Sequence, residues 1–157
     1  MNKQLLLETL LTELNRVHQV AVDAVKRAHA TASDKANIPE NKYDTLALEA
    51  GYLAQGQSKR VEQCAADIQA FEQLNYLAYK KVQSGALVLL LDESDKEKWL
   101  FFGPAAGGLK VEFESKEIIV VTASSPLGKA INQAEVGQEV TVNVAGKQIC
   151  YEVLAIY

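Results

Sequence analysis

Three acidic side chains lie close together in one short polar stretch of the sequence, residues 31–44. They are Asp34, Glu40 and Asp44. Carboxylate oxygens are ligands that Mg²⁺ prefers, and a bound Mg²⁺ can activate water for attack on a phosphate. A cluster of acids must overcome its own repulsion unless a cation or a partner offsets it, although acids also favour helix N-termini. The stretch is therefore a candidate site for a metal or a partner, or else a plain helix cap.

The polar stretch separates two long segments whose composition is compatible with helices. Residues 2–30 contain no Gly and no Pro, and a second apolar pattern runs from Tyr43 to about Lys81. The Ser, Asp, Asn and Pro residues between them are typical of positions where one helix stops and the next begins. We therefore expect an antiparallel two-helix coiled-coil hairpin over residues 1–80, with its tip near residues 31–44.

Apolar residues in the first segment return at alternating spacings of three and four, as in the seam of a coiled coil. They are Leu7, Leu10, Leu14, Val17, Ala21, Ala24 and Ala28. The second segment supplies a partner stripe of Leu46, Leu53, Val61, Cys64, Ile68, Phe71, Leu74 and Leu77. Gly51 and Gly56 interrupt this stripe, and each costs up to about 1 kcal/mol relative to Ala in a helix interior. In a hairpin the same glycines can permit close contact between the helices.

The periodicity changes near residues 79–85, and residues 83–157 alternate short apolar runs with turns. The expected strands are residues 86–91, 99–102, 109–113, 118–122, 140–144 and 149–156, and a short helix is expected at 127–132. The chain is therefore predicted to be α+β, a helical hairpin followed by a small, mainly antiparallel β-sheet domain with one short helix. The Gly-rich stretch 103–108 lacks the Gly-Lys-Ser/Thr ending of a phosphate-binding loop, which argues against nucleotide binding.

Composition excludes several classes of protein. A formal net charge of −4 does not suit a protein that covers a large surface of duplex nucleic acid. No apolar run approaches the roughly 20 residues that span a membrane, and the N-terminus does not resemble a signal peptide. Cys64 and Cys150 stand far apart and form no metal or redox motif. We therefore expect a cytoplasmic protein with no membrane partner.

The C-terminal half carries a recognisable series of motifs. Residues 121–130 read Val-Thr-Ala-Ser-Ser-Pro-Leu-Gly-Lys-Ala, residues 136–140 read Val-Gly-Gln-Glu-Val, and residues 151–154 read Tyr-Glu-Val-Leu. This series resembles the C-terminal domain of the Gre transcript-cleavage factors, and Glu40 with the Asn that follows it resembles the Glu-Asn pair of that family's second helix. The resemblance implies a coiled-coil arm joined to an FKBP-like C-terminal domain, which is the layout inferred above.

The resemblance also implies a partner, bacterial RNA polymerase. The tip would enter the secondary channel of the polymerase, where Glu40 would help to hold a catalytic Mg²⁺ that belongs to the polymerase, with Asp44 and Asp34 as further tip residues. The protein would then have no catalytic residues and no cofactor of its own, and it would not be an enzyme. The family pattern is Asp-x-x-Glu-Asn, and here Asn37 stands at the position of the Asp. A neutral amide is a poorer Mg²⁺ ligand, so we expect modulation of transcription in preference to RNA cleavage.

The most specific part of the resemblance is the segment Ser125, Pro126, Leu127, Gly128 and Lys129. We expect this segment to form part of the surface that docks on the polymerase, because an apolar side chain beside a basic one suits a contact patch. The competing interpretation is a simple helix cap with the leucine in the core. The protein is expected to be a monomer whose contact with nascent RNA is indirect.

Two other classes of function stay open on sequence alone. An FKBP-like domain could be a peptidyl-prolyl isomerase, which would need a pocket lined by aromatic residues. The candidates are Trp99, Phe101, Phe102, Phe113 and Tyr151, and the alternative is that they fill a small core. The helical hairpin could also serve as an adaptor or chaperone without any polymerase partner.

Overall fold

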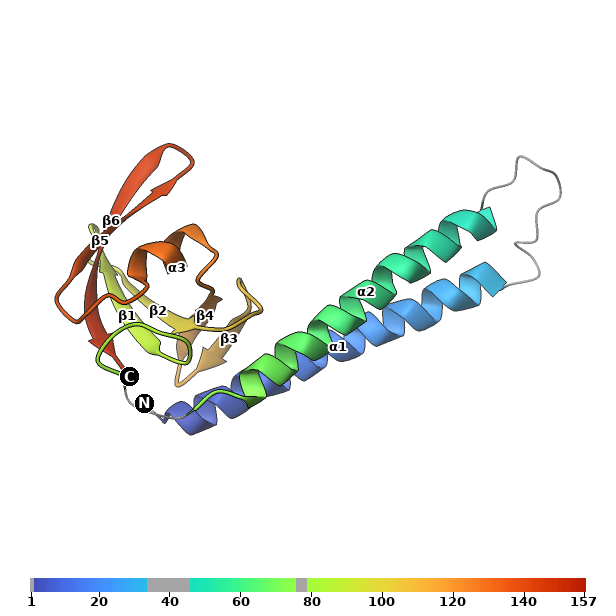
Figure 1. Ribbon diagram of the computed structural model, residues 1–157, viewed down its shortest axis with the longest axis horizontal. Helices are drawn as coiled ribbons and strands as arrows, with labels where there is room; N and C mark the ends of the chain where they lie inside the picture. The colour runs from blue at the N-terminus through green and yellow to red at the C-terminus, as the bar shows by residue number, and fades with distance from the viewer. Residues whose placement is uncertain (1, 34–45, 76–78) are drawn as a thin grey trace. The chain divides into compact units, whose positions relative to one another are not determined.

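The computed structural model describes residues 2–33, 46–75 and 79–157. Figure 1 shows its helices and strands in chain order. They are α1 (Lys3–Ser33), α2 (Leu46–Glu72), β1 (Leu87–Asp92), β2 (Glu97–Phe102), β3 (Lys110–Phe113), β4 (Lys116–Val121), α3 (Pro126–Ile131), β5 (Glu139–Val144) and β6 (Lys147–Ile156). The predicted α+β class, with a helical region followed by a sheet and one short helix, is confirmed. None of the described helices is long and apolar enough to cross a membrane.

The chain divides into two compact units. The arm unit is Thr12–Ile68 and contains most of α1 and α2. The sheet unit is Met1–Leu11 together with Gln69–Tyr157. The first turns of α1 and the end of α2 therefore pack with the sheet.

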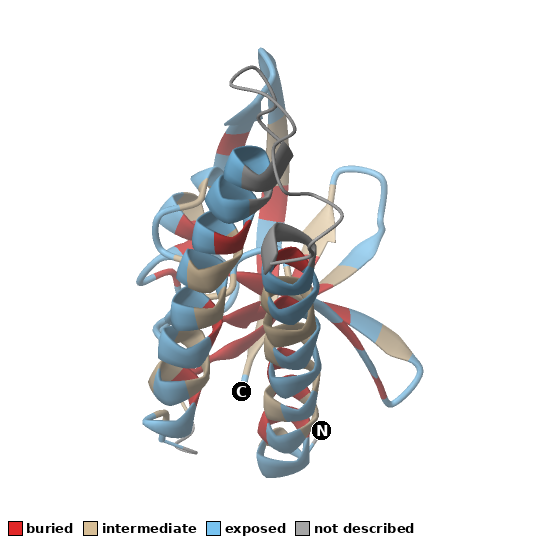
Figure 2. Cartoon of the chain, turned by 90° about the vertical axis from the view of Figure 1, so that its right-hand side faces the viewer, coloured by how far each residue is buried: buried red, intermediate tan, exposed pale blue. Residues whose placement is uncertain are grey.

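In the arm unit, α1 and α2 lie side by side and run in opposite directions (Figures 1 and 2). The seam predicted for α1 is the face that is buried. Leu14, Ala21 and Ala28 are at most 6 % exposed, and Val17 and Ala24 between them are half-buried. The side chains of this seam become small toward the end of α1, which limits the apolar area that the helix pair can bury there.

Two expectations for the first half of α2 are wrong. Leu53 does not belong to the stripe that faces α1, because its side chain is 56 % exposed while the neighbouring Ala54 is buried. Gly51 and Gly56 do not mark a close approach of the helices. Both are exposed, and a Cβ at either position would meet no atom within 4 Å.

The end of α2 also differs from the sequence expectation. The helix stops at Glu72 instead of continuing to about Lys81, and the N–H of Leu74 donates to the carbonyl oxygen of Phe71 in a tight turn at 3.1 Å. Apolar residues continue beyond this point because they pack in the sheet unit: Tyr79 lies against its core. A continuing apolar pattern did not distinguish a longer helix from a connecting segment that covers the sheet.

The sheet has six strands in the order β3-β4-β2-β1-β6-β5. Adjacent strands are antiparallel, except for β2 and β4, which are parallel and place Phe101 opposite Val120. The β1–β2 pair is the hairpin predicted from sequence, with Leu87 opposite Phe101. A mainly antiparallel sheet is thus confirmed, while the parallel pairing of β2 with β4 was not anticipated.

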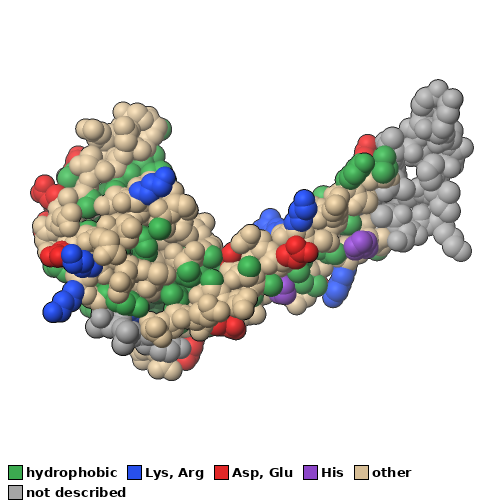
Figure 3. Space-filling model, in the orientation of Figure 1, with side chains coloured by type: hydrophobic (Ala, Val, Ile, Leu, Met, Phe, Trp, Pro, Cys, Tyr) green, Lys and Arg blue, Asp and Glu red, His purple; other side chains and the backbone are tan. Residues whose placement is uncertain are grey.

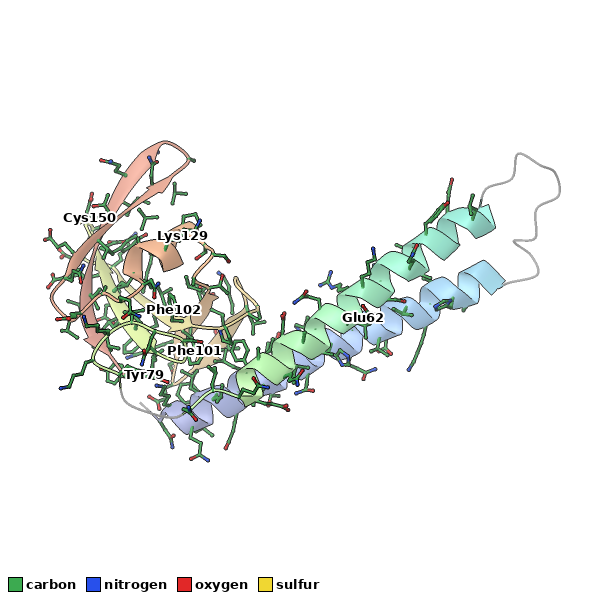
Figure 4. The ribbon with its side chains drawn as sticks, viewed as in Figure 1. Glu62, Tyr79, Phe101, Phe102, Lys129 and Cys150 are labelled. Carbon is green, nitrogen blue, oxygen red and sulfur yellow. The ribbon has the colours of Figure 1, made fainter. Side chains whose placement is uncertain are left out.

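Both faces of the central strands are buried, which explains why β1 and β2 read as continuous apolar runs. One face carries the core cluster of Val82, Ala86, Val88, Leu90, Leu100, Phe102, Val121, Ile131, Ala134, Val140, Val142, Tyr151 and Val153. On the other face, the ring of Phe101 stacks on Phe71 from the last turn of α2, with the ring centroids 5.9 Å apart. Figure 4 labels Phe101 and Phe102, which are neighbours on β2 and pack in the cores on opposite faces of the sheet.

The charged turn between β1 and β2 is held by one carboxylate. Oδ1 of Asp92 accepts hydrogen bonds from the backbone N–H groups of Ser94 at 2.8 Å and Lys96 at 3.0 Å. The N–H of Lys96, followed by that of Ser94, stabilises the ionised carboxylate, so the pKa of Asp92 is lowered from its ordinary value.

Candidate functional site

The predicted tip residues Asp34, Asn37, Glu40 and Asp44 lie outside the described residues. What the structure gives is their attachment: α1 leads into the segment at Ser33 and α2 leaves it at Leu46. The role of these residues in holding a metal stays a prediction.

The second candidate site, the segment 125–129, is the beginning of α3. Ser125 is the N-cap residue of the helix. Its Oγ accepts the N–H of Gly128 at 3.0 Å and donates to the carbonyl oxygen of Thr122 at 2.9 Å. Pro126 follows in the first turn, where its missing N–H costs nothing because that group has no partner within the helix. This hydroxyl therefore joins the end of β4 to the start of α3.

Gly128 is required by packing. A Cβ at this position would collide with the carbonyl oxygen of Thr122, and Gly128 itself is buried. The absence of a side chain lets the first turn of α3 lie directly on the chain that leaves β4. The Ser-Pro-x-Gly part of the motif is thus a device that fixes the position of one short helix.

The remaining residues of the segment divide between core and surface. Leu127 is half-buried and packs against the core cluster, as the helix-cap interpretation expected. Pro126 and Lys129 are exposed, and Figure 4 labels Lys129 on α3. A docking surface at this segment would consequently rest on Pro126 and Lys129, while Ser125 and Gly128 hold them in place.

The arm carries charges of both signs. Arg16 makes a bidentate pair with Glu13 one turn earlier, with Nη2 to Oε1 at 2.7 Å and Nε to Oε2 at 2.9 Å. The hydrogen bond from Arg16 lowers the pKa of the Glu13 carboxyl. The Arg16 guanidinium is therefore paired with an acid of its own helix, while Lys59 and Arg60 are exposed bases on α2.

Other chemistry finds little support in the part of the chain that the structure describes. No three His, Cys, Asp or Glu side chains among these residues are grouped so that they could hold a metal ion. The five aromatic residues considered for an isomerase pocket are each at most 9 % exposed, so they fill the core. In the Gly-rich loop, the N–H groups of Gly103 and Gly108 donate to Val121 and Val120 of β4 at 2.9 and 2.8 Å, which leaves neither free for a phosphate.

Sequence reasoning missed Thr122, the residue that organises the α3 segment. Its carbonyl oxygen accepts from Ser125, and its side-chain oxygen lies 2.9 Å from the hydroxyl of Ser124. The signal was available, because the predicted strand ended at this residue and a Ser-Pro dipeptide followed. The exposed valines Val136 and Val144, which are 58 % and 49 % exposed, were also not singled out.

Comparison with known proteins agrees with the motifs. The family model described as "Transcription elongation factor, GreA/GreB, C-term" matches residues 77–157. The transcription elongation factor GreA of Caulobacter vibrioides is 32 % identical over 149 residues, which cover 95 % of this chain and 91 % of the relative. GreA of Francisella tularensis subsp. novicida is 24 % identical and covers 95 % of this chain and 90 % of the relative.

A solved structure of the transcription factor Gfh1 shares 20 % sequence identity and covers 96 % of this chain and 92 % of that chain, at a TM-score of 0.41. The family assignment rests on the sequence matches, which extend over both the helical region and the sheet domain. The chain belongs to the GreA/GreB family of transcription elongation factors.

Proposed function

We propose that this protein binds bacterial RNA polymerase and inserts the tip of its helical hairpin, residues 31–44, into the secondary channel of the polymerase. The observation that carries the proposal is the 32 % identity to a GreA factor over 95 % of the chain, because the match includes the arm as well as the sheet domain. The protein would act as a cytoplasmic monomer and would contact nascent RNA only indirectly.

In this proposal the sheet domain docks on the polymerase through the start of α3. Pro126 and Lys129 supply the exposed part of the surface, and Ser125 and Gly128 position them. Leu127 contributes through the core that supports the helix. An exposed lysine at a protein interface mainly accelerates association with an acidic partner surface, so its effect should weaken as salt is added.

The tip would modulate catalysis at the active site of the polymerase. Glu40 offers one carboxylate to a Mg²⁺ that the polymerase holds, and Asp34 and Asp44 are further candidates. Asn37 offers only a neutral amide oxygen, so the donor set is weaker than a pair of carboxylates. The favoured activity is therefore regulation of transcription through occupation of the channel, with cleavage of backtracked RNA weak or absent. The protein itself contributes no catalytic residue and no cofactor.

Stalled, backtracked elongation complexes provide the test. Labelled RNA is followed by gel electrophoresis after addition of the wild type, Asn37→Asp or Glu40→Ala, and binding to the polymerase is measured in parallel. We expect the wild type to bind and to change RNA extension with little shortening of the RNA. Asn37→Asp should create or strengthen cleavage because it restores the second carboxylate.

Glu40→Ala should remove the effect on catalysis while binding stays nearly unchanged. If Glu40→Ala acts like the wild type, the tip has no role at the metal and the arm works by obstructing the channel. If the wild type does not bind the polymerase at all, the proposal is wrong as a whole.

A further inference from the structure

Packing along α2 is uneven. In the later part of the helix within the arm unit, Cys64 is buried and Val61 and Ile68 are half-buried. In the earlier part, residues 46–57, the buried residue among those whose burial the structure describes is Ala54. An alanine buries a single methyl group, so the residues of this part whose burial the structure describes contribute little hydrophobic stabilisation.

The larger apolar side chains among residues 48–57 remain largely in water. Leu48 is 57 % exposed, Tyr52 is 66 % exposed and Leu53 is 56 % exposed. Figure 3 shows hydrophobic side chains at the surface of the arm next to the grey residues. Because more than half of each side chain stays in solvent, these three residues do little to hold the helix against α1.

The part of α1 that faces residues 46–57 also buries only small side chains, among the residues whose burial is described. Val22 and Val25 of α1 line one shallow groove with Ser58 and Val61 of α2. Since the two helices are antiparallel, the part of α1 beyond this groove lies opposite residues 46–57. Among the residues of this part whose burial is described, the buried one is Ala28, so the side chain that it offers to the pair is as small as that of Ala54.

Two glycines lower the stability of the same stretch. Gly51 and Gly56 are both inside α2 and exposed, and a Cβ at either would meet nothing within 4 Å. Each costs about 1 kcal/mol relative to Ala, because glycine loses more conformational freedom on entering a helix. Nothing packs in the space that the missing side chains leave, so this cost has no compensation within the described chain.

The hydrogen bonds of α2 change character at Ser58. Its Oγ donates back to the carbonyl oxygen of Ala54 at 2.9 Å, an arrangement that slightly weakens and often bends a helix. Beyond it, the Gln63 amide donates to Asp67 at 2.8 Å, an i to i+4 pair that supports the helix. The weakly held part therefore ends near residue 57.

We infer that residues 46–57, the first three turns of α2, are a locally unfolding segment that opens and closes while the later part of the helix stays folded. Local stability in proteins varies in this way wherever buried apolar contacts are few. The inference concerns the free protein and does not depend on the proposed function.

Amide hydrogen exchange of the full-length free protein, resolved by residue, tests the inference. We expect the amides of residues 50–57 to exchange at least about 100-fold faster than those of residues 61–68. The variant Gly51→Ala/Gly56→Ala should slow exchange of residues 50–57 about 25-fold, from about fivefold for each glycine. Each single variant should show its own fivefold share.

Gln55→Ala is the matched control, since it changes an exposed side chain between the two glycines and should slow exchange by about twofold or less. Circular dichroism verifies that each variant is folded. The inference is overturned if residues 50–57 of the wild type are as protected as residues 61–68. It is equally overturned if the double variant leaves their exchange unchanged.

Discussion

The arm unit and the sheet unit use their side chains in different ways. In the sheet unit, the central strands are buried on both faces and aromatic rings such as Phe101 are nearly inaccessible. In the arm unit, the buried seam tapers to alanines, and the residues next to it are mostly exposed (Figure 2). A substitution in the sheet unit disturbs many contacts, whereas most positions of the arm can change without loss of packing.

The difference also separates the two candidate sites, the segment at Ser125 and the tip. Ser125 and Gly128 are fixed by specific contacts to Thr122, so few replacements fit. The tip position at Asn37, by contrast, departs from the acidic residue of the Gre pattern. Packing thus explains the identity of Ser125 and Gly128, whereas Asn37 lies outside the described residues and its role stays a prediction.

The largest expected effect follows from removing the Phe101 ring from the core on the face of the sheet that packs against Phe71. Phe101→Ala leaves a cavity beside Phe71 and should lower the free energy of unfolding of the sheet unit by about 3–5 kcal/mol. Chemical denaturation followed by circular dichroism measures this. Tyr52→Ala on the arm removes an aromatic ring that is 66 % exposed and should change stability by less than about 0.5 kcal/mol. Equal losses for the two variants would refute the contrast between the units.

Replacing a glycine by alanine should change the stability of the protein in opposite directions in the two units. Gly128→Ala forces α3 away from Thr122 and should destabilise the protein by about 1–3 kcal/mol. Gly51→Ala places its methyl group in open space and should stabilise the helix by about 1 kcal/mol or less. Thermal and urea unfolding of the two variants give the comparison, and two shifts of the same sign would contradict it.

Lys129→Glu should separate binding from stability in the sheet unit. Lys129 is exposed on α3, so the melting temperature should stay within about 1 °C of the wild type. If the proposed docking surface is used, affinity for RNA polymerase should fall about tenfold at low salt, mostly through slower association. Lys147→Glu makes the same charge change at the exposed start of β6 and serves as the control. Equal affinity of all three proteins would remove this surface from the proposal.

Much of the fold could be predicted because its elements have local causes. The heptad seam of α1, the charged β1–β2 turn and the Ser-Pro start of α3 each follow from residues close in sequence. The end of α2 could not be predicted in this way. Apolar residues such as Tyr79 continue the pattern but pack on the sheet, and periodicity does not say which surface an apolar side chain will meet.

The candidate site at the start of α3 could likewise be predicted only in part from the sequence. The segment at Ser125 was recognised from its residues, but its division into holding and exposed residues depends on Thr122, a contact that only the folded chain reveals. The open space beside Gly51 and Gly56 likewise depends on how far α1 lies from them. The sequence singled out these residues, but it could not give the distances that decide whether each one packs against a neighbour or is exposed.

The smallest expected effect concerns Lys3, which joins three segments of the sheet unit. Its Nζ donates to the carbonyl oxygen of Tyr157 at 3.2 Å and lies 4.1 Å from the centre of the Tyr79 ring. Partial burial removes water from the ammonium group and lowers the pKa of Lys3 from 10.5 to about 8. The folded protein therefore gives up this proton at a lower pH than the unfolded chain does.

Because the unfolded chain binds more protons between pH 8 and 10.5, the free energy of unfolding should rise with pH across that window. Below pH 8 both states are protonated and the full cost of burying the charge is present. Solvent screens the half-buried group, so the gain should stay below about 1 kcal/mol. Urea unfolding at pH 7.5 and at pH 10 measures the change in the free energy of unfolding. Other groups also titrate in this range, so the contribution of Lys3 is the difference between the change in the wild type and the change in Lys3→Met.

In Lys3→Met, the rise in the free energy of unfolding with pH that is due to Lys3 should be absent. The control variant Lys80→Met, at an exposed position, should retain this rise. The hydrogen bond to Tyr157 and the contact with the Tyr79 ring both favour the charged form and so oppose the effect of burial. If they dominate, the wild type and Lys3→Met will follow parallel curves from pH 7.5 to 10. The base of α1 would then be held by a charged lysine at every pH in that range.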